Sequence, residues 1–418
     1  AALASRQDAS LSCGRPLLPS ERPRSREPSR RASRAMLQAL RAALGYQAAE
    51  QMAPACERVV SRWASMRPTG VSRRDLALAC SEPSRRLEFG CFLQKELKIR
   101  FAQRAQFFEG LPYGLVECPG IQGILRRQKS YIACLESCPP PETLQLDHAF
   151  TRLVEQIQEQ QQYFEADLFA SCRGLSAPPE ARAHLDEILH HAVGSRVGTK
   201  VLMAHYTQSA RTPDPSRVGV VDLQCRPGDV ARLAARQCAA VCRRELGEAP
   251  QVSVQEEGSE SYALIPGYLL YMLNEVTKNA CHATVKRHAG SPLPPVVVRV
   301  DHHQSGATIS VRDNAGGMTG ARLQDAWRFL HTTMEPKCSP QIAGDGDEPA
   351  SSGTELAGFG VGLPKSRLYA RFFGDDLTLD SVPGEGTEAR LTIRGDGGCR
   401  SEIGFGTVVP MSLFGIAT

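Results

Sequence analysis

Apolar residues recur every three or four positions over most of the chain between residues 50 and 210. This spacing puts them on one face of a helix, and proline or glycine separates one run from the next, as in LPYG and CPPPET. Long amphipathic helices with short connections are typical of an up-and-down bundle. The expected helices are 53–65, 75–80, 87–108, 121–138, 148–171 and 180–208.

The pattern changes near Asp214, after which short runs rich in Val, Ile, Leu and Thr alternate with helical runs. Such alternation predicts a mixed sheet that is covered by helices on one face. The fold class is therefore α+β, with units at 1–41, 42–214, 215–395 and 396–418. The expected strands are 218–225, 250–255, 295–303, 307–313, 377–382 and 388–393, and the expected helices are 227–246, 267–288, 323–330 and 363–373.

The segment GFGVGLPKSRLYARFFG, residues 358–374, leads from alternating glycines directly into an amphipathic helix. Gly358, Gly360 and Gly362 lack a Cβ, so backbone N–H groups can turn toward an anion and phosphate oxygens can come close. The pattern favours a nucleotide phosphate loop. Taken alone, it also fits a loop that only turns a corner.

Two polar residues stand four apart in the helical run YLLYMLNEVTKNACHATVKRH, namely Glu275 and Asn279. At this spacing they project side by side from the helix. A carboxylate beside an amide oxygen suits a hard cation such as Mg²⁺, and it suits a nucleophile that must lose a proton. The alternative is the solvated face of an ordinary helix.

Between these segments, ATISVRDNAGGM is a strand that ends in Asp313 and a flexible turn. An acidic residue at this position can accept a hydrogen bond from an adenine amino group. Gly316 and Gly317 would let the base lie against the backbone.

The order of these three motifs resembles the N, G1 and G2 boxes of the nucleotide-binding fold shared by gyrase, Hsp90, histidine kinases and MutL. The words NEVTKNACHAT and GFGVGLPKSRLYARFFGDDL resemble most those of the mitochondrial 2-oxoacid dehydrogenase kinases, the pyruvate and branched-chain groups. FLQKELKIRFAQRAQFFEGLP and VGSRVGTKVLMAHY are similar to helices of that family's amino-terminal bundle, so the resemblance covers roughly residues 50–395. It implies a four-helix-type bundle followed by an α/β-sandwich ATP-binding domain.

The resemblance also implies roles for individual residues. Glu275 matches the glutamate that orients and deprotonates the substrate hydroxyl, and Lys278 accompanies it in the motif, positioning phosphate or Glu275. Asn279 matches the Mg²⁺ ligand, and Asp313 matches the adenine-reading aspartate. The polar run 331–356 matches the ATP lid, and ATP, Mg²⁺ and, by resemblance, K⁺ are the expected cofactors. The remaining nucleotide contacts expected are Gly317, Thr332, Thr333, Gly358, Phe359, Gly360, Val361, Gly362, Leu363 and Thr387.

Three departures from the family pattern bear on activity. His282 stands where the family usually has arginine, and Ala315 replaces the first glycine of D-x-G-x-G, which requires a negative φ there. The helix around residues 160–164 has the sequence EQQQYF, where relatives have histidine near the active site. A catalytically weak or inactive nucleotide-binding regulator of the same complex is therefore an alternative to the kinase.

Two further functions fit parts of the sequence. A two-component histidine kinase needs a phosphoacceptor histidine followed by an acidic residue, whereas His190, His191 and His205 are followed by His, Ala and Tyr. A lipoyl-domain binding module without catalysis fits the motifs except for Glu275. The resemblance implies a protein serine kinase that acts on the E1α subunit, docks on the lipoyl-bearing E2 core and forms a homodimer; pyruvate and branched-chain complexes both remain open as substrates.

Composition and charge indicate where in the cell the protein is expected. The first 41 residues are rich in Arg, Ser, Ala and Pro and poor in acidic residues, which is typical of a transit peptide for the mitochondrial matrix, with a plastid or a disordered basic tail with nucleic-acid affinity as alternatives. The net charge of +4 is small, no nucleic-acid partner is expected, and no run of about 18 apolar residues predicts a membrane span. The 14 cysteines form no C-x-x-C pair, so we expect reduced and mostly buried thiols.

Overall fold

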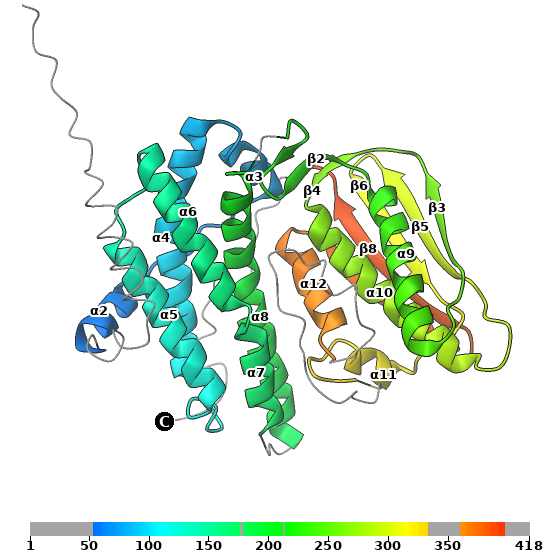
Figure 1. Ribbon diagram of the computed structural model, residues 1–418. Coiled ribbons are helices and arrows are strands. Elements are labelled where there is room, and N and C mark those ends of the chain that lie inside the picture. Colours follow the sequence, from blue (N-terminus) through cyan, green and yellow to red (C-terminus); the bar gives the residue numbers. More distant parts are fainter. Residues whose placement is uncertain (1–52, 176–178, 212–213, 333–359, 398–418) are drawn as a thin grey trace, which may run out of the picture.

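The first half of the molecule is a helical bundle (Figure 1). The computed structural model describes residues 53–175, 179–211, 214–332 and 360–397. α3 begins with a capping box, in which Ser72 accepts from the backbone N–H of Asp75 and Asp75 accepts from that of Ser72. The helices of this half are α2 (Ala53–Ala64), α3 (Arg73–Ala79), α4 (Pro83–Glu109), α5 (Pro119–Ser137), α6 (Leu144–Gln161), α7 (Phe164–Arg173) and α8 (Pro179–Gln208).

The helix expected over 148–171 is in fact two helices, because the chain breaks at Gln162 and Tyr163 between α6 and α7. No proline or glycine marks this break in the sequence. The guanidinium of Arg196, on α8, donates to the carbonyl of Gln161 at 2.6 Å. This contact replaces a helical hydrogen bond that the last carbonyls of α6 lack. The break is therefore stabilised by a tertiary contact.

The second half contains two sheets. β1 (Arg217–Val218), β2 (Val221–Cys225) and β4 (Tyr262–Leu264) form a small antiparallel sheet in the order β1-β2-β4. The larger sheet has the order β3-β5-β6-β8-β7, and only β3 and β5 are parallel among these neighbours. Its strands are β3 (Val252–Glu257), β5 (Val296–His303), β6 (Gly306–Arg312), β7 (Asp376–Val382) and β8 (Gly386–Arg394).

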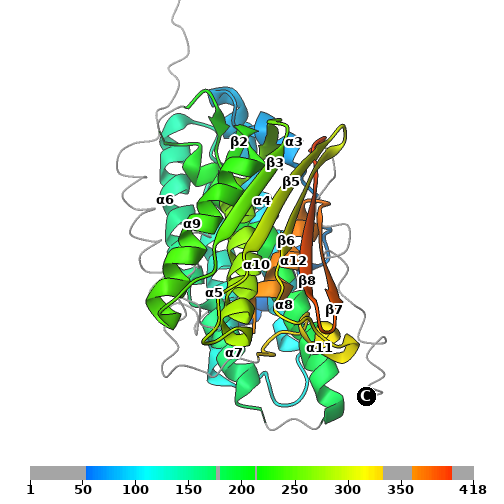
Figure 2. The same ribbon diagram turned by 90° about the vertical axis from the view of Figure 1, so that its right-hand side faces the viewer.

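Helices α9 (Pro227–Leu246), α10 (Pro266–Arg287) and α12 (Gly362–Phe372) cover the face of the large sheet that looks toward the bundle (Figure 2). Along the strands, buried residues alternate with more exposed ones, as expected for a sheet that is covered on one face. In β5 the buried residues are Val296, Val298 and Val300. α12 packs between α10 and α8, so it joins the two halves. The short α11 (Gly320–Asp325) follows the turn after β6.

The prediction of a helical bundle followed by a mixed α/β domain is confirmed. The ten cysteines whose side chains are described are all free thiols, and seven of them are buried. Burial raises the pKa of Cys134 to about 11 and those of Cys172 and Cys238 to about 12, which makes these thiols poorly reactive. Among the described helices, none is long and apolar enough to cross a membrane.

Candidate active site

Helix α10 carries the first part of the site. Leu269, Met272 and Leu273 of this helix are buried, whereas Glu275 and Asn279, one helical turn apart, are less buried. The Nζ of Lys278 donates to Oε1 of Glu275 at 2.7 Å, and the two side chains are only 9 % and 13 % exposed. Asn279 is exposed. The carboxylate is thus fixed by its ammonium neighbour, and the amide stays open to solvent.

The beginning of α12 faces this carboxylate. A Cβ on Gly362 would lie 2.0 Å from Oε2 of Glu275, so a larger residue there would require the glutamate side chain or the helix end to move. Gly362 is the first residue of α12, and Val361 is its N-cap. The free N–H groups of a helix amino terminus favour an anion. The structure therefore brings Glu275 and a potential phosphate-binding helix end into contact.

A buried carboxylate lies at the end of β6. Asp313 is 6 % exposed, and its Oδ1 accepts from the backbone N–H of Ala315 at 2.9 Å and of Thr387 at 3.3 Å. Neither bond uses Oδ2. Burial raises the pKa of Asp313, and the two backbone donors oppose this shift. The arrangement can present one carboxylate oxygen to a ligand amino group.

The turn after Asp313 packs against the β7–β8 hairpin. Gly317 has φ +61°, and a Cβ there would lie 2.1 Å from the carbonyl oxygen of Val382. The Oγ of Ser381 accepts a hydrogen bond from the backbone N–H of Met318 at 2.7 Å and lies 2.9 Å from the hydroxyl oxygen of Thr387. Gly317 and Thr387 are therefore near Asp313, and Ser381 is a supporting residue that the sequence motifs did not indicate.

Leu330 and His331 pack against Gly360 of the glycine loop. Leu330 has φ +62°, and its N–H donates to the carbonyl of Gly360 at 2.7 Å. Gly360 has φ +69°, and a Cβ there would lie 2.4 Å from the carbonyl oxygen of His331. Thr332 is exposed at this base. Val361, Gly362 and Leu363 are half-buried at the start of α12, whereas Thr333, Gly358 and Phe359 lie outside the described residues.

The donor set fits a magnesium nucleotide. Mg²⁺ in kinases is usually held by one or two protein oxygens together with phosphate oxygens, so a dense carboxylate cluster is not needed. Within the described ranges no group of three or more His, Cys, Asp or Glu residues could hold a metal ion. Asn279 and Glu275, one helical turn apart on α10, are the side chains that would supply protein oxygens.

The departures from the family pattern are placed as follows. Among the described non-glycine residues, only Tyr113 and Leu330 have a positive φ. The φ of Ala315 is therefore not positive, as an alanine at this position requires. His282 is half-buried on α10, one turn beyond Lys278. Gln161 is buried at the end of α6, 3 % exposed, and its Nε2 makes no hydrogen bond within the described part of the chain.

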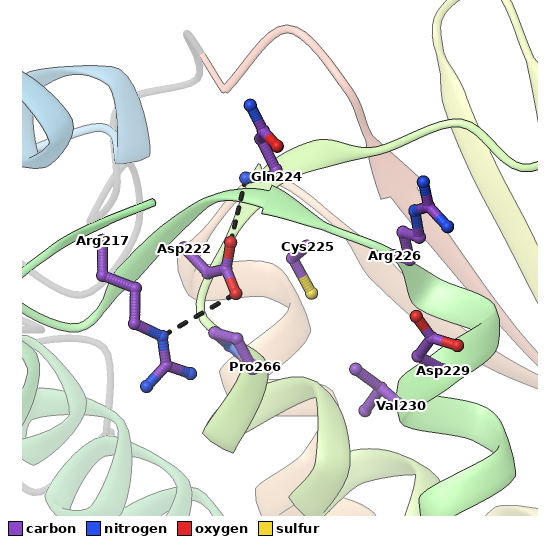
Figure 3. A pocket seen from close by; sticks show the side chains of 8 residues that line it. All are labelled: Arg217, Asp222, Gln224, Cys225, Arg226, Asp229, Val230 and Pro266. Carbon is purple, nitrogen blue, oxygen red and sulfur yellow. Dashed lines mark hydrogen bonds and ion pairs between the residues drawn. The ribbon is translucent and has the colours of Figure 1, made fainter. Parts of the chain in front are cut away.

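A separate hollow of about 370 Å³ lies at the amino ends of α9 and α10 (Figure 3). It contains the ion pair Arg217–Asp222, and burial raises the pKa of its Cys225 to about 12. None of the predicted site residues lines it. Its lining residues are Arg217, Asp222, Gln224, Cys225, Arg226, Asp229, Val230 and Pro266.

Comparison with known proteins gives the class and then the family. Residues 266–396 match the histidine kinase-, DNA gyrase B-, and HSP90-like ATPase family, so the second half is an ATP-binding domain of this class. Residues 70–222 match the mitochondrial branched-chain alpha-ketoacid dehydrogenase kinase family. The chain belongs to the family of mitochondrial pyruvate and branched-chain 2-oxoacid dehydrogenase kinases, and is an ATP-dependent protein kinase of that family.

Three relatives illustrate the match. A mitochondrial pyruvate dehydrogenase (acetyl-transferring) kinase of Arabidopsis thaliana is 30 % identical over 342 residues, which cover 79 % of this chain and 92 % of the relative. The corresponding kinase of Schizosaccharomyces pombe is 32 % identical over 47 % of each chain. Kinase isozyme 3 of Mus musculus is 25 % identical over 72 % of this chain and 75 % of its own.

Proposed function

We propose that this chain transfers the γ-phosphate of Mg-ATP to a serine of the E1α subunit of a mitochondrial 2-oxoacid dehydrogenase complex and thereby inactivates it. The observation that carries the proposal is the contact between Glu275 and the amino end of α12, since a proton acceptor and a phosphate-binding helix end lie next to each other. The family match supports the substrate class. It does not separate the pyruvate complex from the branched-chain complex.

In the proposed reaction, Asp313 accepts a hydrogen bond from the adenine amino group, and Gly317 and Thr387 lie against the adenine ring. Backbone donors of residues 360–363 hold the phosphates, with Gly358, Phe359, Thr332 and Thr333 as further contacts. Asn279 would hold Mg²⁺, which neutralises phosphate charge when bound. Little covalent chemistry is asked of the protein, because phosphoryl transfer depends mainly on positioning and on charge stabilisation.

Glu275 orients the serine hydroxyl and takes its proton as the bond to phosphorus forms. Lys278, whose Nζ lies 2.7 Å from Oε1 of Glu275, holds that carboxylate in place and leaves Oε2 for the hydroxyl. General-base catalysis of this kind contributes about 10²–10⁴-fold to the rate. Glu275 and Lys278 are thus the proposed catalytic pair.

The other units follow from the same proposal. The helical unit at 42–214 would dock on E1α and on the lipoyl-bearing E2 core, the unit at 215–395 would carry the chemistry, and the chain would form a homodimer in the mitochondrial matrix. The relatives are described as mitochondrial, which supports the location. Residues 1–41, the proposed transit peptide, lie outside the described residues, as does the tail 396–418 from residue 398 onward.

The test is transfer of labelled γ-phosphate to purified E1α from the pyruvate and branched-chain complexes, each offered with its E2 core. We expect incorporation on one E1α, and a loss of at least about 100-fold in Glu275→Gln with unchanged Mg-ATP affinity. Asp313→Ala should instead weaken ATP binding about tenfold or more, since it removes a hydrogen bond to a charged acceptor. ATP binding without incorporation on either E1α would leave the nucleotide-binding regulator as the better description.

A further inference from the structure

Helix α12 is anchored to the bundle one turn after the residue that faces Glu275. The Nζ of Lys365 donates to Oε2 of Glu165, on α7, at 2.7 Å. Both side chains are 8 % exposed, although they are 200 positions apart in the sequence. The backbone N–H of Lys365 also closes the first helical hydrogen bond of α12, to the carbonyl of Val361 at 3.0 Å. The same residue therefore belongs to the helix end and to the bundle.

Glu165 does not act alone. Its second oxygen accepts from Arg196, on α8, at 2.9 Å, and Arg196 also holds the carbonyl of Gln161 at the break between α6 and α7. The result is a row of three buried charges, Arg196–Glu165–Lys365, that crosses from α8 through α7 to α12. In a buried row each charge depends on its partners, because an unpaired charge in the interior is strongly unfavourable.

The ammonium of Lys365 is also bounded by aromatic rings. Its Nζ lies 5.3 Å from the ring centroid of Tyr271 and 5.7 Å from that of Tyr369. Tyr271 is on α10, one helical turn before Glu275, and its ring packs edge-on against Tyr369 at 5.2 Å. The side chain of Lys365 thus contacts both helices that make up the proposed phosphate site.

The other end of α12 offers a comparison. Asp375, two residues after the C-cap residue Phe373, forms an ion pair with Arg73 of α3 at 2.7 Å. This pair is as deeply buried, with exposures of 4 % and 3 %, and it also joins the two halves of the chain. It lies at the end of α12 that is remote from Gly362. The two pairs thus lie at opposite ends of α12, and only the Lys365 pair is close to the phosphate loop.

We propose that Lys365 is a positioning residue for the phosphates of ATP: bound to Glu165 and Arg196, it fixes the first turn of α12, and so the backbone N–H groups of the phosphate loop, relative to Glu275. This inference rests on the proposed function, because it assigns a task at the same nucleotide site. It adds that bundle residues on α7 and α8 set the geometry of the phosphate loop without contacting nucleotide.

The test compares Lys365→Met, which keeps the length of the side chain, with Arg73→Met as the matched control in the full chain. Affinities are measured for Mg-ATP and for adenosine, which lacks phosphates, together with the melting temperature. We expect Lys365→Met to weaken Mg-ATP binding about tenfold and adenosine binding less than about twofold. Arg73→Met should lower the melting temperature by a similar amount but weaken both ligands equally or neither.

Two more variants keep the test decisive if Lys365→Met does not fold. Glu165→Gln preserves shape and should shift the same ATP-to-adenosine ratio, and the double variant Glu165→Gln/Lys365→Met should lose no more affinity for Mg-ATP than the larger single change. An unchanged ratio in Glu165→Gln, or an equal shift in Arg73→Met, overturns the inference. Because these readouts are binding constants, they stand apart from the phosphate-transfer assay, whose failure in the unaltered chain would instead overturn the substrate assigned to the kinase.

Discussion

The two halves of the molecule bury charge in different ways. The bundle contains many buried charged side chains that are remote from Glu275 and Asp313, among them Glu96, Arg100, Arg104 and Asp147. Among the described residues of the ATP-binding half, the buried charges are Lys278 and Asp313 at the proposed site, Lys365 on α12 and Asp375 just after that helix. The remainder of that interior is largely apolar. The comparison indicates that buried charge mainly fixes the packing of the bundle, whereas two of the four buried charges described in the second half, Lys278 and Asp313, lie at the proposed site and the other two form ion pairs with the bundle half.

Arg104 shows how the bundle achieves this. It is 2 % exposed, and the described contacts of its guanidinium are neutral acceptors: Gln128, the hydroxyl and carbonyl of Ser195, and Thr199. Burial, with Arg196 and Arg100 nearby, lowers the pKa of Arg104 to about 9. These four hydrogen bonds fix α4 against α5 and α8. Loss of such a group should cost stability rather than chemistry.

The largest effect is expected when a buried ion pair of the bundle loses one partner. Asp147→Ala removes the acceptor of Arg86, at 3.1 Å, and of the hydroxyl of Tyr206, at 2.5 Å. It leaves Arg86 without its buried carboxylate, so the free energy of unfolding should fall by about 3–5 kcal/mol in urea titrations. The surface pair Asp229–Arg232 provides the control, since Asp229→Ala should cost less than about 1 kcal/mol. A comparable cost for both variants would remove the contrast between the halves.

The next effect belongs to the site. Gly362→Ala puts a Cβ 2.0 Å from Oε2 of Glu275, so the glutamate or the helix end must move. We expect a loss of about 100-fold in phosphate transfer, equal to about 2.7 kcal/mol, with little change in melting temperature. Gly320→Ala is the control, because a Cβ there meets nothing within 4 Å. Full activity in Gly362→Ala would show that this contact does not matter for transfer.

A smaller effect should appear at acid pH in the bundle. Burial and then Arg86 lower the pKa of His205 to about 3, and neither ring nitrogen has a hydrogen-bond partner among the described residues. The folded chain keeps His205 neutral while the unfolded chain gains a proton below about pH 6.5, so stability is lost as the pH falls from 6.5 toward 3.

His205→Met should therefore recover about 2 kcal/mol of unfolding free energy at pH 5 relative to pH 7, as measured by denaturation at the two pH values. His148→Met, at an exposed position on α6, should leave the pH dependence as it is. If His205→Met had the same acid sensitivity as the unaltered chain, the histidine would not be the group that titrates.

The smallest effect tests a departure from the family pattern. Ala315→Gly restores the family's first glycine, but the position has no positive φ and does not need one. We expect ATP affinity to change less than about twofold and stability to fall by about 0.5–1 kcal/mol, through the greater backbone entropy of the unfolded chain. Tighter ATP binding in this variant, by calorimetry, would mean that alanine limits the site.

Local patterns in the sequence were sufficient for much of this molecule. The helix expected at 227–246 has the bounds of α9, because a proline begins it and Gly247, in the left-handed region at φ +82°, ends it. The placement of Asp313 at a strand end and of Gly362 at a helix start also followed from hydrophobic period and glycine spacing. The assigned roles of these residues stay predictions until the variants are measured.

Other features could not be read from the chain. β4 was missed because three residues with no clear alternation form a strand only by pairing with β2. The break between α6 and α7 has no local signal and depends on Arg196. Lys365 lies within the glycine-loop motif, and nothing near it in the sequence indicates Glu165 as its partner.

The sequence by itself determined the order of the elements, the two halves and the three nucleotide motifs, because period, turn chemistry and glycine placement act over a few residues. The tertiary structure decided which charges meet: Lys365 with Glu165, Arg73 with Asp375, and Glu275 with the start of α12. These contacts join residues that are far apart in the chain. The strength of these contacts depends on how deeply the folded chain buries both partners, and no local sequence pattern indicates that burial.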